Sequence, residues 1–426
     1  MSRWLLLLSL CALGLPAAAQ TVAITGGRVV TMGPAGDLAR GTVVIRDGRI
    51  VAVGADVPVP PDARVIDAAG RIVTPGLIAP ATSLGLVEVR MVEATDDRGT
   101  ANSRISAAFD AAYGLNPDSI LIPVARLGGI TRALVVPSYK DKAGRELMFA
   151  GTAAAITLDG RTAPVKRGAA MMLEMGDAGA ERAGGARAAA LLSLRAVLAE
   201  VRDYKLRRAD YDRGATRDYI LSRADMEALI PVVDGVMPLL VTVNRASDIR
   251  DMLALAREER IRLILEGAAE GWRVAGEIAA ARAPVLLTPV ENTPASFEKL
   301  GSTLENAQRL AAAGVVIAIE GNGSHREREM RYNAGNAVAS GLDWSAALAA
   351  ITINPARIFG MADRAGSIET GKDGDVVVWD GDPLDTLSRP IAVVIGGVSQ
   401  PMTSRATELR DRYLPAITAP ANGELP

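Results

Sequence analysis

The feature that most constrains the fold is an alternation of short apolar segments with longer helical segments through the middle of the chain. The apolar segments are short and rich in Val, Ile and Leu, which is typical of strands buried on both faces of a parallel sheet. They lie at residues 130–136, 153–158, 170–173, 239–243, 263–265, 285–288 and 315–319. Together with a strand at Leu77 they predict eight parallel strands. This number closes a (β/α)8 TIM-type barrel, so the predicted class is α/β.

Helices are predicted between these strands, at residues 186–211, 246–259 and 302–313. Asp343 stands directly before a further apolar helical pattern that carries Ala347, Leu348 and Ile351. A carboxylate at this position accepts from a free backbone N–H of the first turn, so Asp343 is predicted to cap that helix.

The two ends of the chain are rich in β signals. Residues 21–32 favour a strand, residues 41–54 predict a hairpin around Asp47-Gly48, and residues 64–73 predict another around Ala69-Gly70. Strands are also predicted at 375–380 and 391–395. We therefore expect a small β-sandwich-like domain built from 20–74 and 363–405, a barrel over 75–362, and a C-terminal tail over 406–426. This tail is expected to be loose from Pro415 onward.

The first 19 residues have the pattern of a secretory signal peptide. Arg3 supplies the positive charge, residues 4–15 are apolar, and residues 16–19 are the small residues of a cleavage site before Gln20. Leu10 precedes Cys11 where a lipoprotein signal would need a small residue. The sequence therefore predicts a periplasmic protein without a membrane anchor.

Charge and composition narrow the chemistry. The formal net charge is −2 and the isoelectric point about 5.8, which favours neither nucleic acid nor an anionic membrane as a partner. The chain has one cysteine, Cys11, and one histidine, His325. If Cys11 is removed with the signal peptide, the mature protein has no thiol for a disulfide, a nucleophile or a metal site.

Several ordered motifs carry a resemblance to a known family. They are Val73-Thr74-Pro75-Gly76-Leu77-Ile78, Gly128-Gly129-Ile130-Thr131, Ile351-Thr352-Ile353-Asn354-Pro355-Ala356-Arg357, Gly366-Ser367-Ile368 and Gly371-Lys372-Asp373-Gly374-Asp375-Val376. The series resembles the metal-dependent amidohydrolases, particularly their exported, imidazolonepropionase-like branch, over nearly the whole mature chain. The resemblance implies a TIM barrel, zinc or another divalent metal, and hydrolysis of carbon–nitrogen bonds.

The positions at which the resemblance implies metal ligands hold other residues. The first-strand histidines fall on Ala81 and Ser83, the fifth-strand histidine on Thr242, and the sixth-strand histidine on Gly267. The eighth-strand aspartate falls on Asn322, and Glu174 is the nearest candidate for the fourth-strand ligand. Methyl, hydroxyl and amide groups are poor substitutes for imidazole and carboxylate on zinc. We therefore predict that the chain binds no catalytic metal and needs no cofactor.

The polar side chains near these mapped positions predict a small, mildly polar pocket for a neutral ligand. Its candidate residues are Asn244, Glu266, Glu320, Asn322 and His325. His325, in a loop after the eighth strand, is interpreted either as an exposed loop residue or as a general base. A carboxylate-only site for a hard cation, made from Glu88, Glu174, Glu266 and Glu320, is a further alternative.

Three functions follow from these observations. The first is a non-catalytic amidohydrolase homologue that binds an unknown small molecule or a homologous active subunit, in a homo- or hetero-oligomer. The second is a hydrolase of carbon–nitrogen bonds, such as those of N-acyl amino acids or dipeptides, with a site that the motifs do not reveal. The third is a metal-free hydrolase built around His325.

Overall fold

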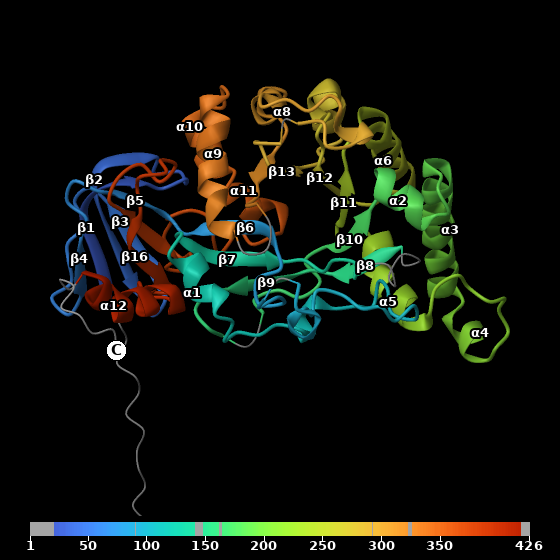
Figure 1. Ribbon diagram of the computed structural model, residues 1–426, viewed down its shortest axis with the longest axis horizontal. Coiled ribbons are helices and arrows are strands. Elements are labelled where there is room, and N and C mark those ends of the chain that lie inside the picture. The colour runs from blue at the N-terminus through green and yellow to red at the C-terminus, as the bar shows by residue number, and fades with distance from the viewer. Residues whose placement is uncertain are drawn as a thin grey trace, which may run out of the picture.

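The computed structural model describes residues 21–418, except residues 90, 141–147, 162–163, 292 and 323–325. The predicted signal peptide and His325 therefore lie outside the described residues. A β-rich region carries both ends of the described chain, and a larger α/β region lies between them in sequence and beside them in space (Figure 1).

One sheet of eight strands contains segments from both ends of the chain. The contact between the ends is the antiparallel pair β5–β15, in which Val376 faces Pro75 and Trp379 faces Ile72. The indole N–H of Trp379, which is fully buried, donates to Thr74 Oγ1 at 2.9 Å. The strands are β1 (Val22–Val30), β2 (Asp37–Arg46), β3 (Arg49–Gly54), β4 (Arg64–Asp67), β5 (Ile72–Pro75), β15 (Val376–Trp379), β16 (Pro390–Ile395) and β17 (Val398–Ser399).

Of the two predicted hairpins, one forms and one does not. β2 and β3 pair around Asp47-Gly48, where both residues have positive φ. The hairpin predicted for 64–73 is wrong, because β4 and β5 each pair in parallel with β1 and follow one another along its edge. The turn around Gly70 stays on that edge, since Ala68 N–H donates to Thr25 O and Arg28 N–H to Arg71 O.

The α/β region contains two groups of parallel strands. β6 (Leu77–Thr82) pairs with β7 (Ile130–Val135). The second group runs in the order β10 (Met171–Glu174), β11 (Leu239–Val243), β12 (Leu263–Gly267), β13 (Val285–Leu287) and β14 (Ile317–Ile319). Residues 350–351 lie between the two groups, because Ile319 N–H donates to Ala350 O and Ile78 N–H to Ile351 O.

The strand predicted at 153–158 exists, but it is not parallel to its neighbours. β9 (Ala154–Thr157) runs antiparallel to β7, and β8 (Phe149–Thr152), just before it, runs antiparallel to β10. The described residues between β9 and β10 form no helix, and that segment contains Gly160, Pro164 and Gly168. A parallel connection needs a long crossover, usually a helix, so the chain turns back antiparallel instead. The prediction of eight parallel strands is therefore wrong for one of them, β9, which runs antiparallel.

The strands share an inner hydrophobic cluster, to which each of the eight strands β6, β7 and β9 to β14 contributes a side chain. These are Ile78, Leu134, Ala155, Met172, Leu240, Ile264, Leu286 and Ala318. A second cluster lies between the outer faces of the strands and the helices. The helices are α1 (Leu121–Arg126), α2 (Gly176–Arg182), α3 (Arg187–Leu206), α4 (Arg208–Asp212), α5 (Arg223–Val233), α6 (Ala246–Glu259), α7 (Ala275–Ala280), α8 (Asn306–Ala312), α9 (Met330–Ala339), α10 (Trp344–Ala349), α11 (Ile353–Ile358) and α12 (Arg405–Thr418).

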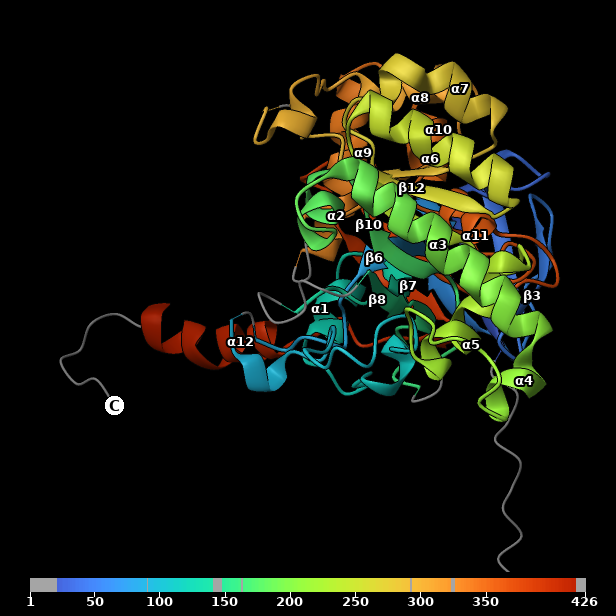
Figure 2. The same cartoon turned by 90° about the vertical axis from the view of Figure 1, so that its right-hand side faces the viewer.

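The helix predictions hold in outline. α6 has the predicted bounds, and Asp343 caps α10 by accepting from Ala346 N–H at 3.0 Å. The helix predicted over 186–211 is divided at Arg207 into α3 and α4. Residues 405–418 form α12, so the expectation of a loose chain from Pro415 onward is wrong for residues 415–418. Figure 2 shows this helix projecting from the body of the protein.

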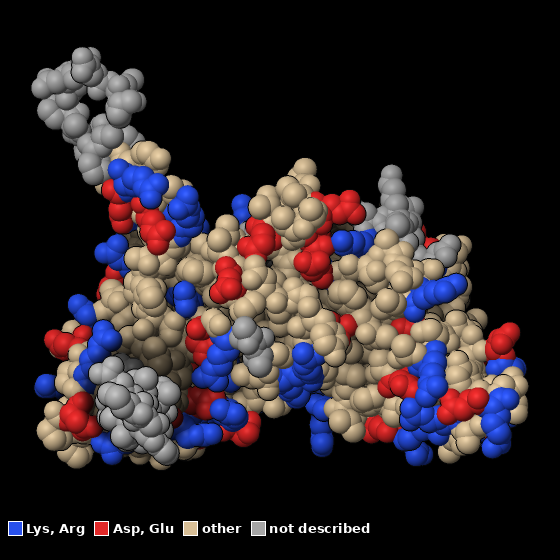
Figure 3. Space-filling model, turned by 90° about the horizontal axis from the view of Figure 1, so that it is seen from below, with Lys and Arg blue, Asp and Glu red and all other residues tan. Residues whose placement is uncertain are grey.

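A buried ion cluster connects the two regions. Arg132 on β7 has a side chain that is only 4% exposed, and its guanidinium lies 2.6 Å from a carboxylate oxygen of both Asp373 and Asp375. Elsewhere charges of both signs alternate on the face seen in Figure 3, as expected for a solvated surface. None of the helices in the described part of the chain has the length and hydrophobicity needed to cross a membrane.

Candidate functional site

A layer of polar side chains lies directly above the inner cluster, at the carboxyl ends of the strands. Glu174, Thr242, Glu266 and Glu320 each come two residues after a member of that cluster, so the alternation of a strand places them on the same face. All four are partly exposed, whereas the cluster members that precede them are buried. We call these four residues the polar layer.

Thr242 and Glu266 are opposite one another on β11 and β12. The Thr242 hydroxyl donates a hydrogen bond to Glu266 Oε2. Burial raises the pKa of Glu266 and the charge of Glu174 raises it further, while the hydrogen bond from Thr242 acts in the opposite direction. The position to which the resemblance assigns a fifth-strand ligand is thus occupied by a hydroxyl engaged with a carboxylate of the protein.

Glu320 is the least satisfied member of the polar layer. Its Oε1 is buried and has no hydrogen-bond partner among the described residues. Burial raises the pKa of Glu320 well above its ordinary value, and the negative charges of Glu266 and Glu291 add to this effect. The site therefore favours the protonated, neutral carboxyl group, which can both donate and accept a hydrogen bond.

Glu174, in contrast, is neutralised by an arginine. Arg182 Nη2 lies 2.9 Å from Glu174 Oε2, and the Arg182 guanidinium carbon lies 3.4 Å from the centre of the Tyr139 ring. The Tyr139 hydroxyl donates to Met148 O at 2.7 Å and accepts from Glu174 N–H at 3.2 Å. Burial, followed by the charge of Glu174, raises the pKa of Tyr139. This arrangement pairs the Glu174 side chain with Arg182 within the protein.

The two first-strand positions present little chemistry. Ala81 packs against the inner cluster, so it faces the interior below the polar layer. Ser83 is 7% exposed, and its hydroxyl oxygen has no hydrogen-bond partner among the described residues. Between them, Thr82 turns away and donates a hydrogen bond to Glu327 in η6 (Glu327–Glu329), just before α9.

The sixth-strand position is closed by its neighbour. Gly267 has φ of +83°, and a Cβ atom built there would lie 2.6 Å from Asn244 Oδ1. Asn244 is 4% exposed and donates through Nδ2 to Glu298 Oε1 at 2.8 Å. Asn244, a predicted pocket residue, therefore fills the space that a larger side chain at 267 would need.

The eighth-strand position is also engaged within the protein. Asn322 Nδ2 donates to Glu329 Oε2 at 2.8 Å, and Asn322 Oδ1 accepts from Asn333 at 3.2 Å. Asn333 also donates to the backbone oxygen of Glu320 at 2.7 Å. The amide of Asn322 thus links β14 to α9, and His325 lies outside the described residues of the same loop.

The described side chains do not gather into a group that fits a metal ion. Among the described residues, no three Asp, Glu, His or Cys side chains are grouped so that they could hold one. Glu88, one member of the carboxylate-only alternative, accepts hydrogen bonds from Asn116 and Ser119 instead. Glu174 is paired with Arg182, which leaves only Glu266 and Glu320 from the four predicted carboxylates.

Sequence reasoning missed Glu327, because nothing in its local pattern marks it. Its side chain is buried beside the end of β6, 245 residues away in sequence, where it accepts from Thr82. Burial raises the pKa of Glu327 to about 7, although the Thr82 hydrogen bond opposes the shift. The tertiary structure thus places a third carboxyl with a raised pKa next to the strand that carries Ala81 and Ser83.

Comparisons with known proteins agree with this architecture. The model of the amidohydrolase family matches residues 142–405, which is more than half of the chain. Amidohydrolase tasK of Hapsidospora irregularis is 26% identical over 396 residues, which cover 84% of this chain but 40% of that protein. The imidazolonepropionase of Symbiobacterium thermophilum is 27% identical over 420 residues, covering 85% of this chain and 89% of that enzyme.

Solved structures give the same fold at lower identity. An amidohydrolase from Thermotoga maritima has a TM-score of 0.79 and 24% identity, covering 90% of this chain and all of that one. Molinate hydrolase follows with a TM-score of 0.57 and 20% identity. Such neighbours imply a TIM barrel with an added β-rich domain, in keeping with the α/β architecture and mixed sheets described above.

Proposed function

Because the chain belongs to the amidohydrolase family, we propose that it is a member that binds a small neutral molecule in place of a catalytic metal. Its homologues include an imidazolonepropionase and other amidohydrolases, so its relatives hydrolyse carbon–nitrogen bonds. Fold and family do not by themselves give the activity of one member, which depends on the site. We take the strands to form the closed barrel of this family, which the shared inner cluster supports.

The observation that carries this proposal is the internal pairing at the mapped ligand positions. Thr242 is bonded to Glu266, and Asn322 is bonded to Glu329 and Asn333. Ala81 and Gly267 have no donor atoms. A catalytic zinc needs about three protein ligands and an open position for water. At these positions only Ser83 has a free oxygen, and a neutral hydroxyl is a weak ligand for zinc.

The raised pKa values support a neutral ligand. Burial favours the uncharged carboxyl forms of Glu266 and Glu320, so the polar layer carries less negative charge near neutral pH than two exposed glutamates would. Glu320 Oε1 and Ser83 Oγ are both buried without a partner, which is an unfavourable state unless a bound molecule or water satisfies them. An uncharged amide or carbonyl compound has the complementary groups.

Metal loading and binding tests separate this proposal from an active enzyme. We expect purified protein incubated with zinc, manganese or iron(II) salts to retain less than a tenth of an equivalent after desalting. We also expect no turnover of N-acyl amino acids or dipeptides with any of these metals present. One equivalent of metal, or turnover that a chelator abolishes, contradicts the proposal.

The neutral-ligand assignment is tested with a matched pair of probes. We expect N-acetylalanine amide to bind more tightly than the anion N-acetylalanine in equilibrium dialysis, with affinity falling as pH rises through the raised pKa of Glu320. The variant Glu320→Gln keeps a donor and an acceptor at that position but cannot ionise. It should remove the pH dependence while the amide still binds. Equal binding of both probes contradicts the assignment.

A second candidate is a metal-free hydrolase that uses Glu266 and Glu320. Two carboxyls with raised pKa values in the polar layer are able to supply a proton donor and a proton acceptor at neutral pH, which favours this alternative. Its signature is turnover that resists chelators, is lost in Glu320→Gln, and has a bell-shaped pH profile. A hydrolase built around His325 would lose activity in His325→Gln and keep it in Glu320→Gln.

We also propose export to the periplasm with cleavage before Gln20 and, as the alternative to a small-molecule ligand, association with a homologous active subunit. The support is the sequence pattern of residues 1–19 and the absence of an obvious metal centre in the described residues. N-terminal sequencing of protein from the periplasmic fraction tests the first point. Protein that retains Trp4, or lipid attached to Cys11, contradicts it.

A further inference from the structure

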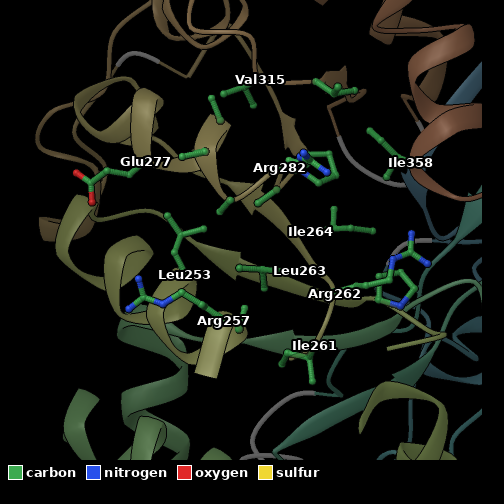
Figure 4. A pocket seen from close by; sticks show the side chains of 18 of the residues that line it. Leu253, Arg257, Ile261, Arg262, Leu263, Ile264, Glu277, Arg282, Val315 and Ile358 are labelled. Carbon is green, nitrogen blue, oxygen red and sulfur yellow. The ribbon is translucent and has the colours of Figure 1, made fainter. Parts of the chain in front are cut away.

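A separate cavity lies at the opposite end of the strands from the polar layer. Its volume is about 1090 Å³, and its lining includes residues at the amino ends of β12, β13 and β14 together with α6 and α7 (Figure 4). A cavity of this size is at the upper end of those that hold small organic ligands. No part of it coincides with the polar layer, because Ile264 and the residues before it line the cavity, whereas Glu266 lies further along the same strand.

The floor of the cavity is aliphatic. Ile261, Leu263, Val315 and Ile358 line it and are 6–7% exposed, so each shows a small part of its side chain to the cavity. Aromatic side chains do not occur among its described lining residues. This floor can cover an alkyl chain, but it offers no ring on which a nucleobase or sugar would stack.

The rim of the cavity is cationic. Arg257, Arg262, Arg282 and Arg357 all line the cavity and are exposed. Arg262 donates to the backbone oxygen of Val236 at 3.1 Å. None of these four arginines forms a salt bridge with another described residue. A fifth arginine, at position 250, is paired with Glu277 at 2.8 Å and adds no net charge.

The negative carboxyl ends of nearby helices offset only part of this positive charge. The carboxyl ends of α6, α7 and α11 lie at the cavity, and arginines at helix ends compensate their partial negative charges. Each helix end is equivalent to roughly −0.5 charge, so three contribute roughly −1.5 against four guanidinium groups. An excess of roughly +2.5 therefore faces the cavity.

We infer that this cavity binds an amphipathic organic anion, namely a carboxylate on an unbranched alkyl chain such as a fatty acid. The exposed guanidinium groups would pair with the carboxylate, and the aliphatic floor would cover the chain. Guanidinium groups bind carboxylates through two parallel hydrogen bonds, which gives such a site selectivity for the anion. The inference is independent of the polar layer and of the function proposed for it.

The test is calorimetric titration of the full mature chain with three ten-carbon probes below their aggregation limits. Decanoate should bind in one saturable step at least tenfold more tightly than decanol or decylammonium. Its affinity should fall as sodium chloride is raised, because the contribution of ion pairing is screened. Inorganic phosphate should not displace it. Equal affinity for the three probes, no salt dependence, or displacement by phosphate overturns the inference.

Variants place the binding in this cavity. The double variant Arg257→Gln and Arg282→Asn removes two rim charges, and Asn tolerates the left-handed backbone of residue 282, whose φ is +53°. It should weaken decanoate binding at least tenfold. The matched control, Arg207→Gln and Arg213→Gln, removes two exposed charges near α4 and should change affinity less than twofold. Equal loss in both double variants, or loss in neither, overturns the assignment; circular dichroism checks that each is folded.

Discussion

Thr242 on β11 and Glu266 on β12 are register partners, and the hydroxyl of one donates a hydrogen bond to the carboxylate of the other. This pair occupies the place where the family resemblance implies a metal-binding imidazole. The hydrogen bond favours the ionised form of Glu266, while burial and the neighbouring charge of Glu174 oppose it. Burial, the Thr242 hydrogen bond and the charge of Glu174 together therefore shift the pKa of Glu266 above its ordinary value.

Removing the Thr242 hydroxyl should raise the pKa of Glu266. Valine has nearly the shape of threonine, so Thr242→Val removes the hydrogen bond and little else. We expect the pKa of Glu266 to rise further in this variant, because the one interaction that lowers it is lost. Carbon-13 NMR of labelled glutamate side chains measures the shift. Thr242→Ser keeps the hydroxyl and should leave the pKa near that of the wild type; an unchanged pKa in the valine variant contradicts the assigned role.

Loss of the proton from Glu327 should lower the free energy of unfolding as pH rises. Its pKa is raised in the folded state to about 7 from an ordinary 4.5, so the folded state holds the proton more tightly than the unfolded state. The unfolding free energy then falls as pH rises from about 4.5 to about 7 and changes no further above that. Glu327→Gln keeps an oxygen for Thr82 but does not titrate. It should match the wild type near pH 4 and exceed it by up to about 3 kcal/mol at pH 8 in urea unfolding.

A side chain at position 267 should be unfavourable for two separable reasons. Gly267→Ala places a Cβ on a backbone with φ of +83° and 2.6 Å from Asn244 Oδ1. We expect a loss of about 1–3 kcal/mol in unfolding free energy. In Asn244→Ala the space opens, so the same glycine substitution should cost less there. A double-mutant cycle measures the difference, and strictly additive effects would show that the contact is not significant.

Restoring a metal centre should need more than the mapped ligands. Histidines at positions 81, 83, 242 and 267 with Asn322→Asp supply the family's ligand set, but Asn244 obstructs position 267. We expect zinc binding to be stronger when Asn244→Ala is added to these five changes than without it. Zinc titration with a competing chelator gives both affinities. Tighter binding in the set that retains Asn244 contradicts this arrangement.

The link between the two regions should depend on Arg132. Arg132→Met removes the buried partner that Asp373 and Asp375 share. Asp373 keeps its ion pair with Arg364 at 2.9 Å, so the variant mainly strands Asp375. Loss of one partner from a buried ion cluster costs about 3–5 kcal/mol, and urea unfolding should show a loss of this size. Adding Asp373→Asn and Asp375→Asn should recover part of it. Full stability of Arg132→Met would show that the cluster contributes little.

Local patterns in the sequence determine the positions of most elements. The β2–β3 hairpin follows from Asp47-Gly48, which accept positive φ, and the cap of α10 follows from Asp343. The bounds of α6 follow from its apolar periodicity. These features depend on residues only a few positions apart, which is why sequence alone predicts them. The ordered family motifs likewise predict an amidohydrolase, and the family match confirms it.

Contacts between distant segments are decided only by the tertiary structure. The direction of β9 depends on its connections, whose described residues contain no crossover helix, and the parallel pairing of β4 and β5 depends on the free edge of β1. The Thr82–Glu327 contact joins residues 245 positions apart. The sequence shows which carboxyl groups are present. Their pKa values depend on burial and on neighbouring charges, and both exist only once the strands are assembled.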